Sequence, residues 1–232
     1  MTQWCFMLTK KLRVIFLKSS GVISTNMMLL LWILAASASH ADVFDYPLSA
    51  SDKRQTEFQK LTAQVRQQGE VAGEFVQQKQ LQILAKPIVS SGRFQLSEQQ
   101  FIWEIEQPFA IGYVFFDQTL VRNMDGEQQT IAPSAEPMLY GFFSFFFSLM
   151  NLSEQSLEQF FNVYYLPAEA ADKSWQLGLL PKNKSIARSL KQLQVQGVGA
   201  QINQVELVEQ GGDKTRLTFS YSSSAIDDQV NP

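Results

Sequence analysis

The feature that most constrains the fold is an alternation of apolar and polar residues that runs through most of the chain. In "FIWEIE", Phe101, Trp103 and Ile105 alternate with polar Glu104 and Glu106, and "SWQLGL" and "TRLTFSY" repeat the pattern. Successive side chains of a strand point to opposite faces of a sheet, so a period of two predicts strands with one buried face and one solvated face.

These segments are numerous and closely spaced. They give roughly eleven strands, at about 71–80, 91–97, 101–106, 109–116, 119–124, 127–132, 161–166, 173–181, 190–196, 200–209 and 213–221. Turn residues such as Asp117-Gln118 and Asp125-Gly126 supply the short connections that join antiparallel neighbours. We expect one long meander that curls into a barrel or half-barrel, whose hollow must be filled by side chains, a ligand or an inserted element.

Helical spacing replaces this alternation at two places. Phe58, Leu61 and Val65 predict an amphipathic helix over about 51–68. A helical insertion at about 137–150 and 153–161 interrupts the strands, and it carries five phenylalanines within positions 142–147. The first of these two helices is apolar nearly all round, yet at about 20 Å it is too short to cross roughly 30 Å of hydrocarbon. We therefore expect the insertion to be a lid that plugs the mouth of the barrel.

The first 41 residues have the pattern of a secretory signal peptide. Basic side chains at Lys10, Lys11 and Arg13 precede the apolar run "MMLLLWILAA", and small residues follow it. We expect cleavage after Ala41, export to the periplasm, and a single domain over residues 42–232. The true start codon stays open, because an internal methionine such as Met7 would leave the rest unchanged.

Residues after Ala41 lack the side chains of several common catalytic systems. The chain's one cysteine, Cys5, and its one histidine, His40, both lie in the expected leader. Nucleophile systems that depend on His or Cys, zinc sites built from them, and disulfides are therefore excluded. From Asp42 onward 15 Lys and Arg face 22 Asp and Glu, so a nucleic-acid interface is not expected. We expect no metal and no cofactor.

The polar residues offer only weak candidates for a site. Glu104 and Glu106 resemble a carboxylate pair, but a solvated strand face explains them better. Asp125 and Asp213 lie beside glycines, as turn residues do. The pair Tyr164-Tyr165 offers hydroxyls for a head group, although structural tyrosines of a strand are the more common case.

The order of short motifs resembles a known family, the periplasmic outer-membrane lipoprotein carriers (LolA). The resemblance covers essentially the whole chain after Ala41, and its motifs, in order, are Phe-x-Gln, Ser-Gly-x-Phe, Phe-x-Trp-x-x-x-x-Pro, Leu-x-Pro and Glu-x-x-Gly-Asp-x-Thr. It implies an unclosed eleven-stranded antiparallel barrel with an α-helical lid over a hydrophobic cavity. Family carriers place an Arg-Pro pair before the aromatic residue of the third strand as a lid latch. Here Glu98, Gln99 and Gln100 precede Phe101, so the resemblance names no latch.

The resemblance implies a monomeric, non-enzymatic carrier that ferries acylated lipoproteins or a related lipid from an inner-membrane exporter towards an outer-membrane acceptor. The alternatives are a periplasmic sensor or scaffold on the same half-barrel and, less favoured, a carboxylate-dependent hydrolase. The same positions fit either a cavity lining or a dry, filled core. The expected lining consists of Phe75, Phe94, Leu96, Phe101, Trp103, Ile105, Trp175, Leu177, Leu217 and Phe219 from strands and Phe142, Phe143, Phe146, Phe147 and Leu149 from the lid.

Overall fold

The computed structural model describes residues 42–49, 53–168 and 173–222 of the 232 in the chain. These residues belong to one compact unit. The expected signal peptide and its cleavage site after Ala41 lie outside the described residues, and both stay predictions, as does the division into a leader and a single domain.

All eleven expected strands are present, and they form one antiparallel sheet. The order in the sheet begins at β6 and ends at β7, and these two edge strands do not pair, so the barrel is unclosed. The predicted half-barrel is thus confirmed. The strands are β1 (Val71–Gln80), β2 (Ile88–Leu96), β3 (Gln100–Gln107), β4 (Ile111–Phe116), β5 (Thr119–Met124), β6 (Glu127–Ile131), β7 (Phe161–Leu166), β8 (Ser174–Pro181), β9 (Leu190–Val198), β10 (Gln201–Glu209) and β11 (Lys214–Tyr221).

The expectation of one long meander was wrong in one respect. The sheet consists of two meanders, β1 to β6 and β7 to β11, which join where β1 pairs with β11. The register runs from Gly73 opposite Tyr221 to Gln80 opposite Lys214. Alternation identifies strands but not which of them are neighbours. The helical insertion between β6 and β7 therefore connects the two edges of the sheet and spans its open side.

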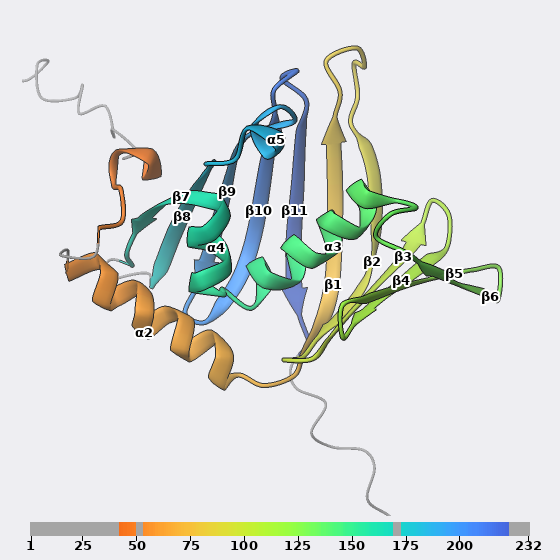
Figure 1. Ribbon diagram of the computed structural model, residues 1–232, viewed down its shortest axis with the longest axis horizontal. Coiled ribbons are helices and arrows are strands. Elements are labelled where there is room, and N and C mark those ends of the chain that lie inside the picture. Colours follow the sequence, from red (N-terminus) through yellow and green to blue (C-terminus); the bar gives the residue numbers. More distant parts are fainter. Residues whose placement is uncertain (1–41, 50–52, 169–172, 223–232) are drawn as a thin grey trace, which may run out of the picture. The chain divides into compact units, whose positions relative to one another are not determined.

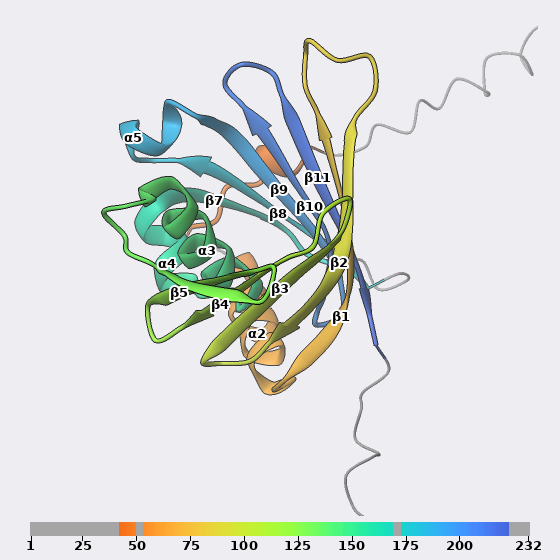
Figure 2. The same ribbon diagram turned by 90° about the vertical axis from the view of Figure 1, so that its right-hand side faces the viewer.

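Within the described residues, three helices of more than one turn accompany the sheet, namely α2 (Lys53–Gln67), α3 (Pro137–Met150) and α4 (Glu154–Phe160). Figure 1 shows α3 running across the strands, and Figure 2, turned by 90°, shows α3 and α4 on the concave side of the curved sheet. Single turns also occur as η1 (Val43–Asp45) and α5 (Lys184–Ala187), which sequence spacing did not predict. We call α3 and α4 together the lid.

The hairpin turns have the backbone conformations that their sequences predict. Asp117 and Gln118 have φ angles of 45° and 56°, and Asp125 and Gly126 have φ angles of 54° and 81°. Positive φ at both central residues defines the type I′ turn, whose twist matches that of the flanking strands. These turns fix the registers of β4 with β5 and of β5 with β6, and hence which side chains face the lid.

The N-terminal segment covers one of the two edges of the sheet. The backbone amide of Leu48 donates to the carbonyl of Val163 at 2.8 Å, and the amide of Tyr165 donates to the carbonyl of Tyr46 at 2.9 Å. This pairing satisfies backbone N–H and C=O groups of the edge strand that could otherwise hydrogen-bond to a strand of another chain. The β7 edge is therefore protected by the protein's own chain.

Candidate ligand-binding site

Aromatic side chains of α3 and of the sheet meet in one cluster on the concave face. Phe146 lies in its middle, 1% exposed, with its ring centroid 5.7 Å from Phe101, 5.6 Å from Trp103 and 6.3 Å from Phe219. Trp103 in turn stacks on Phe75 at 3.6 Å. Rings at such separations make favourable contacts beyond the area they bury. Strands that are distant in the sequence thus share one aromatic contact surface with the lid.

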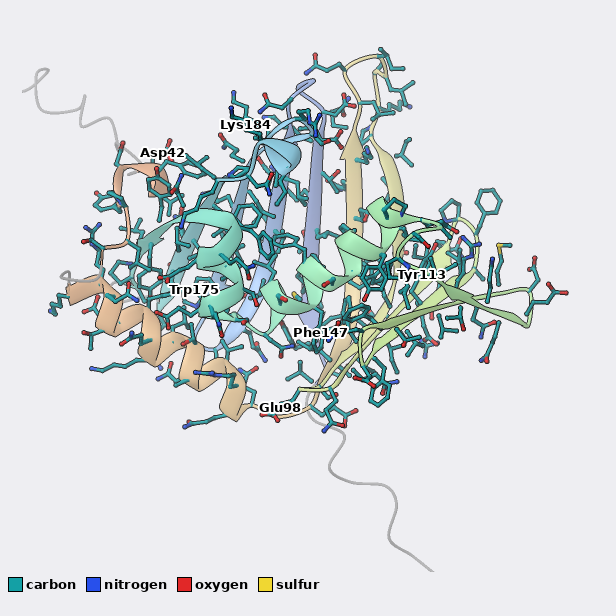
Figure 3. The ribbon with its side chains drawn as sticks, viewed as in Figure 1. Asp42, Glu98, Tyr113, Phe147, Trp175 and Lys184 are labelled. Atoms are coloured by element: carbon teal, nitrogen blue, oxygen red, sulfur yellow. The ribbon has the colours of Figure 1, made fainter. Side chains whose placement is uncertain are left out.

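The structure brings most of the expected lining residues into a single buried core. Three of the fifteen are only partly buried at its margin, namely Ile105, Phe142 and Phe147. Figure 3 places Tyr113 and Phe147 along α3 and Trp175 near α2 and α4. The other twelve are at most 5% exposed, and they are Phe75, Phe94, Leu96, Phe101, Trp103, Phe143, Phe146, Leu149, Trp175, Leu177, Leu217 and Phe219.

In this conformation the concave face is filled by protein side chains. A cleft between the end of α2 and the end of α3, lined by Val65, Leu96, Met150 and Tyr221 among others, has a volume of about 10 Å³. That is room for about one water molecule, against roughly 300–1,000 Å³ for pockets that hold small ligands. The lid's phenylalanines therefore occupy the place where the sequence predicts an acyl chain, and the ligand-binding role of these residues stays a prediction.

Trp175 is fixed by contacts that alternation alone does not indicate. Its indole nitrogen donates to the carbonyl oxygen of Gly199 at 2.8 Å. A Cβ atom added at Gly197 would lie 2.1 Å from a ring carbon of Trp175, so the indole packs directly on the backbone of β9. Such contacts indicate a structural role for this end of the lining.

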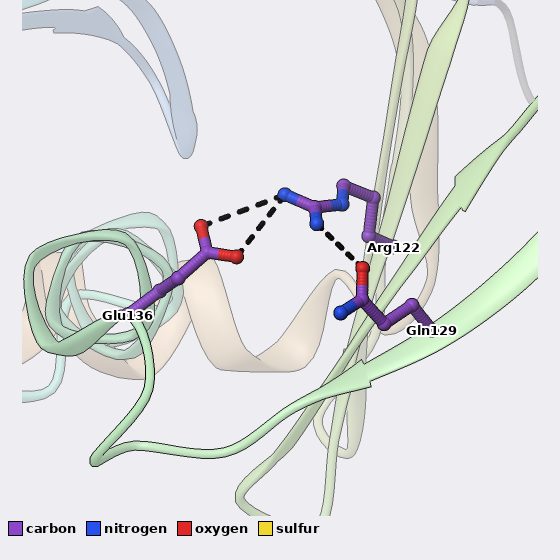
Figure 4. A network of polar contacts seen from close by, with 3 residues as sticks. All are labelled: Arg122, Gln129 and Glu136. Atoms are coloured by element: carbon purple, nitrogen blue, oxygen red, sulfur yellow. Dashed lines mark hydrogen bonds and ion pairs between the residues drawn. The ribbon is translucent and has the colours of Figure 1, made fainter.

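The first turn of α3 is tied to the sheet by polar contacts that sequence reasoning missed. Arg122 on β5 contacts Glu136, the N-cap residue of α3, with 3.2 Å between Nη1 and Oε1. Arg122 also donates to Gln129 of β6, as Figure 4 shows. The hydroxyl of Tyr140 donates to the carbonyl of Gln118 at 2.6 Å. We call Arg122, Glu136, Tyr140 and Gln118 the lid clamp.

A signal for this clamp was present in the sequence. Leu120, fully buried, and Arg122 share a face of β5 because side chains alternate along a strand. A charged residue at an inward-facing position needs a partner, and Glu136 just before Pro137 marks the start of a helix. Burial raises the pKa of the Tyr113 hydroxyl nearby, and the positive charge of Arg122 opposes that rise.

The far end of the lid rests on α2. The side-chain amide of Gln55 donates to the Glu154 carboxylate of α4, and the ring centroid of Phe58 lies 5.3 Å from that of Tyr165. Burial raises the pKa of Tyr165 to about 12. Tyr164 packs edge-on against Phe44 at 5.6 Å. Both tyrosines therefore make structural contacts, and the structure does not bring them to the cluster beneath α3.

The acidic residues weighed as site candidates lie away from the concave face. Arg93 contacts Glu104 at 3.7 Å and Glu106 at 2.6 Å, with all three side chains about half exposed. Asp213 accepts a hydrogen bond from the backbone amide of Gln82 at 2.8 Å and thereby joins two hairpins. These carboxylates serve surface ion pairing and turn structure.

Membrane-spanning helices and metal-ligand clusters are both missing from the described residues. No helix in this part of the chain is long and apolar enough to span a membrane. Over the same residues, no group of three or more His, Cys, Asp or Glu side chains is placed to hold a metal ion.

The family model for outer-membrane lipoprotein carrier LolA-like proteins matches residues 50–229. The chain belongs to this LolA-like family. The match spans the whole described sheet and the lid, and it confirms the resemblance drawn from the motif order. No sequence among the curated proteins matches this chain.

Solved structures that match this LolA-like chain share little sequence with it. A putative outer-membrane lipoprotein-sorting protein domain from Vibrio parahaemolyticus has 10% identity and a TM-score of 0.42, over 81% of this chain and 96% of that one. A LolA superfamily protein from Nitrosomonas europaea has 10% identity and a TM-score of 0.39, over 75% and 94%. Lipoprotein LppX from Mycobacterium tuberculosis has 9% identity and a TM-score of 0.38, over 72% and 97%. The family assignment rests on the family model.

Proposed function

We propose that this protein is a periplasmic, non-enzymatic carrier that takes up the acyl chains of lipoproteins or of a related lipid beneath α3. The observation that carries the proposal is the character of the contact between α3 and the sheet. Along Gly141–Met150 the described side chains of α3 make no hydrogen bond or ion pair with the sheet, whereas their rings pack on Phe101, Trp103 and Phe219. An acyl chain offers the same apolar surface, so it can replace the lid without leaving polar groups unpaired.

The magnitudes favour reversible uptake. Exposing Phe143 and Phe146, each at most 2% exposed here, costs about 3–6 kcal/mol at about 1.5–3 kcal/mol per side chain. Burying about ten methylenes contributes about 8 kcal/mol at about 0.8 kcal/mol each. The difference is a few kcal/mol, so a carrier with this lid binds its cargo and still releases it to an acceptor.

Polar contacts at the two ends of the lid support a path of opening. The lid clamp holds the start of α3, and α4 is held through Glu154 to α2. To leave the sheet, α3 must break the polar contacts of the lid clamp. Its apolar middle has no polar contact with the sheet to break. We infer that α3 opens from its N-terminal end, with donor and acceptor membrane proteins as the partners that the family resemblance implies.

Energy transfer from tryptophan to a dansyl fatty acid tests this proposal and locates the bound chain. From Asp42 onward the protein has two tryptophans, Trp103 on β3 beneath α3 and Trp175 on β8, in the other half of the sheet. We expect saturable binding at one site, displaced by unlabelled palmitate. Transfer should be largely lost in Trp103→Phe and retained in Trp175→Phe. No saturable binding in excess probe, or a loss of transfer only in Trp175→Phe, would contradict the proposed site.

A further inference from the structure

Exposed aliphatic side chains occur at the tip of the β1–β2 hairpin. Figures 1 and 2 show this hairpin extending beyond the lid, beside the β10–β11 turn. Four aliphatic side chains of this hairpin are exposed, with fractions of 88% for Ile83, 40% for Leu84, 50% for Ile88 and 49% for Val89, and the last two, consecutive on β2, point to opposite faces of the hairpin. Hairpin loops usually carry small and polar turn residues, and several exposed aliphatic side chains on one hairpin are typical of an interaction surface. We call these four residues the hairpin tip.

Hydrogen bonds hold the loop of this hairpin in place. The side-chain amide of Gln80 donates to the carbonyls of Leu81 at 3.0 Å and Leu84 at 2.8 Å. The backbone amide of Gln82 donates to Asp213 at 2.8 Å, and its side chain donates to the carbonyl of Gly212 at 2.9 Å. The loop is therefore ordered by its own polar groups and by the β10–β11 turn, while Ile83 stays in solvent.

Two further connections continue from the hairpin tip along the same end of the sheet. Gln210, in the β10–β11 turn, donates through its backbone amide to the carbonyl of Ser189 and through its side chain to the carbonyl of Ala187, each at 2.8 Å. The β1–β2, β10–β11 and β8–β9 connections thus form one hydrogen-bonded edge, which we call the basic rim (residues 79–89, 182–189 and 209–214). Figure 3 places Lys184 at this end and Glu98 at the opposite end of the sheet.

The charge of the basic rim is opposite to that of the chain as a whole. Residues 42–232 carry 15 basic and 22 acidic side chains. The rim departs from this balance with six basic residues, Lys79, Lys86, Lys182, Lys184, Arg188 and Lys214, against only Glu209 and Asp213. Lys79 and Glu209 pair at 3.1 Å and offset each other, which leaves five basic side chains against Asp213. Positive charge is thus concentrated around the hairpin tip.

We propose that the hairpin tip and the basic rim dock on the surface of a bilayer that contains anionic phospholipids. Aliphatic side chains flanked by lysines are the combination that binds a membrane interface, through apolar insertion and attraction to anionic head groups. A protruding tip suits a fluid surface, which adapts to its shape, whereas a stable protein interface needs about 1,000 Å² of complementary surface. This inference goes beyond the proposed function and holds whether or not an acyl chain binds beneath α3.

Sedimentation with lipid vesicles tests the proposal on the protein purified after export. We expect it to sediment with vesicles of equal phosphatidylglycerol and phosphatidylcholine, and to be released at about 1 M salt, where the Debye length falls to about 3 Å. Vesicles of phosphatidylcholine alone should bind much less. Equal binding to both vesicles, or no binding to the anionic ones, would overturn the proposal.

Matched variants separate the hairpin tip from general changes of the surface. Val89 and Val198 are 49% and 48% exposed, and Val198 lies at the opposite end of the strands. Val89→Glu and the double variant Ile83→Glu/Leu84→Glu should lose vesicle binding, while Val198→Glu should keep it. Lys86→Ala and Lys184→Ala should each weaken binding about fivefold. Circular dichroism and thermal unfolding confirm that each variant is folded.

Other occupants of the hairpin tip would give different results. Vesicle binding that Ile83→Glu/Leu84→Glu leaves unchanged, or that Val198→Glu weakens equally, would overturn the proposal. Dimerisation detected by light scattering, abolished by the same double variant and unaccompanied by vesicle binding, would assign the tip to a second copy of this chain and would also overturn it.

Discussion

Breaking the lid clamp should make the protein bind acyl chains more tightly. Arg122 and Glu136 are 3.2 Å apart, with 23% and 39% of their side chains exposed. Ion pairs this accessible are screened by solvent and contribute about 0.2–1 kcal/mol. Glu136 adds a favourable interaction with the N-terminus of α3, worth about 0.3–1 kcal/mol. Arg122→Ala removes only the first of these, so we expect the closed lid to lose up to about 1 kcal/mol.

This loss acts on the closed state alone, because the Arg122–Glu136 contact joins the sheet to the lid and is broken when α3 opens. The apparent dissociation constant equals the intrinsic one divided by the fraction of open protein. When the open form is the minor one, a loss of about 1 kcal/mol raises that fraction, and the apparent affinity for the probe, about fivefold. A variant with a damaged binding site would lose both stability and affinity, whereas this variant should lose stability and gain affinity for the probe.

Titration with a dansyl fatty acid measures the effect, and urea unfolding measures the accompanying stability. Arg122→Ala, Glu136→Ala and the double variant form a cycle that isolates the pair. Arg216→Ala is the matched control, because Arg216 contacts Glu206 at 2.8 Å on the face of β10 and β11 opposite to the buried Leu217. The reasoning is refuted if Arg122→Ala leaves the affinity unchanged or weakens it, or if Arg216→Ala tightens it equally.

Three further predictions follow from the core and the surface. Phe146→Ala, at a position 1% exposed, should lower the free energy of unfolding by about 3–5 kcal/mol. It should also tighten probe binding, because opening α3 then exposes less apolar surface, while Phe116→Ala, at 48% exposure, should change both little. Urea unfolding and probe titration check this. Burial raises the pKa values of Tyr165 and Tyr221 to about 12 from 10.0, so the unfolded state loses these protons first as the pH rises. The free energy of unfolding, constant up to about pH 9, should therefore fall between pH 10 and 12. Urea midpoints measured across this pH range test the prediction, and a flat profile would contradict it. Glu104→Gln, in an exposed pair with Arg93, should change stability by less than about 1 kcal/mol and should not alter probe binding, whereas hydrolysis of a model ester that this change abolished would favour an enzyme.

The strands and their turns could be predicted from the sequence because both depend on local chemistry. Each alternating segment is a strand, and Asp117-Gln118 and Asp125-Gly126 adopt the expected positive φ angles. The pairing of β1 with β11 could not be predicted from alternation, since alternation identifies a strand but does not indicate which other strand lies beside it. That pairing decides that the lid joins the two edges of the sheet.

The sequence predicted which residues face the concave side of the sheet, but not what fills the space between them. Alternation selected Phe75, Trp103 and Phe219 as inward-facing, and they lie in one aromatic cluster. It could not say whether ligand or protein fills the space, because an acyl chain and the Phe146 ring satisfy the same apolar surface. The lid clamp was missed because Arg122 and Glu136 lie on different elements, and their contact depends on where α3 begins.

Locking the lid is the most direct test of the claim that acyl chains enter by displacing α3. From Asp42 onward the chain has no cysteine, so Gln118→Cys/Tyr140→Cys introduces the only two thiols at a contact where the tyrosine hydroxyl lies 2.6 Å from the backbone. We expect the double variant to bind a dansyl fatty acid before treatment and to lose binding once a short bis-maleimide bridges the two thiols, while each single variant treated with the same reagent keeps it. Full binding by the bridged protein would contradict the account.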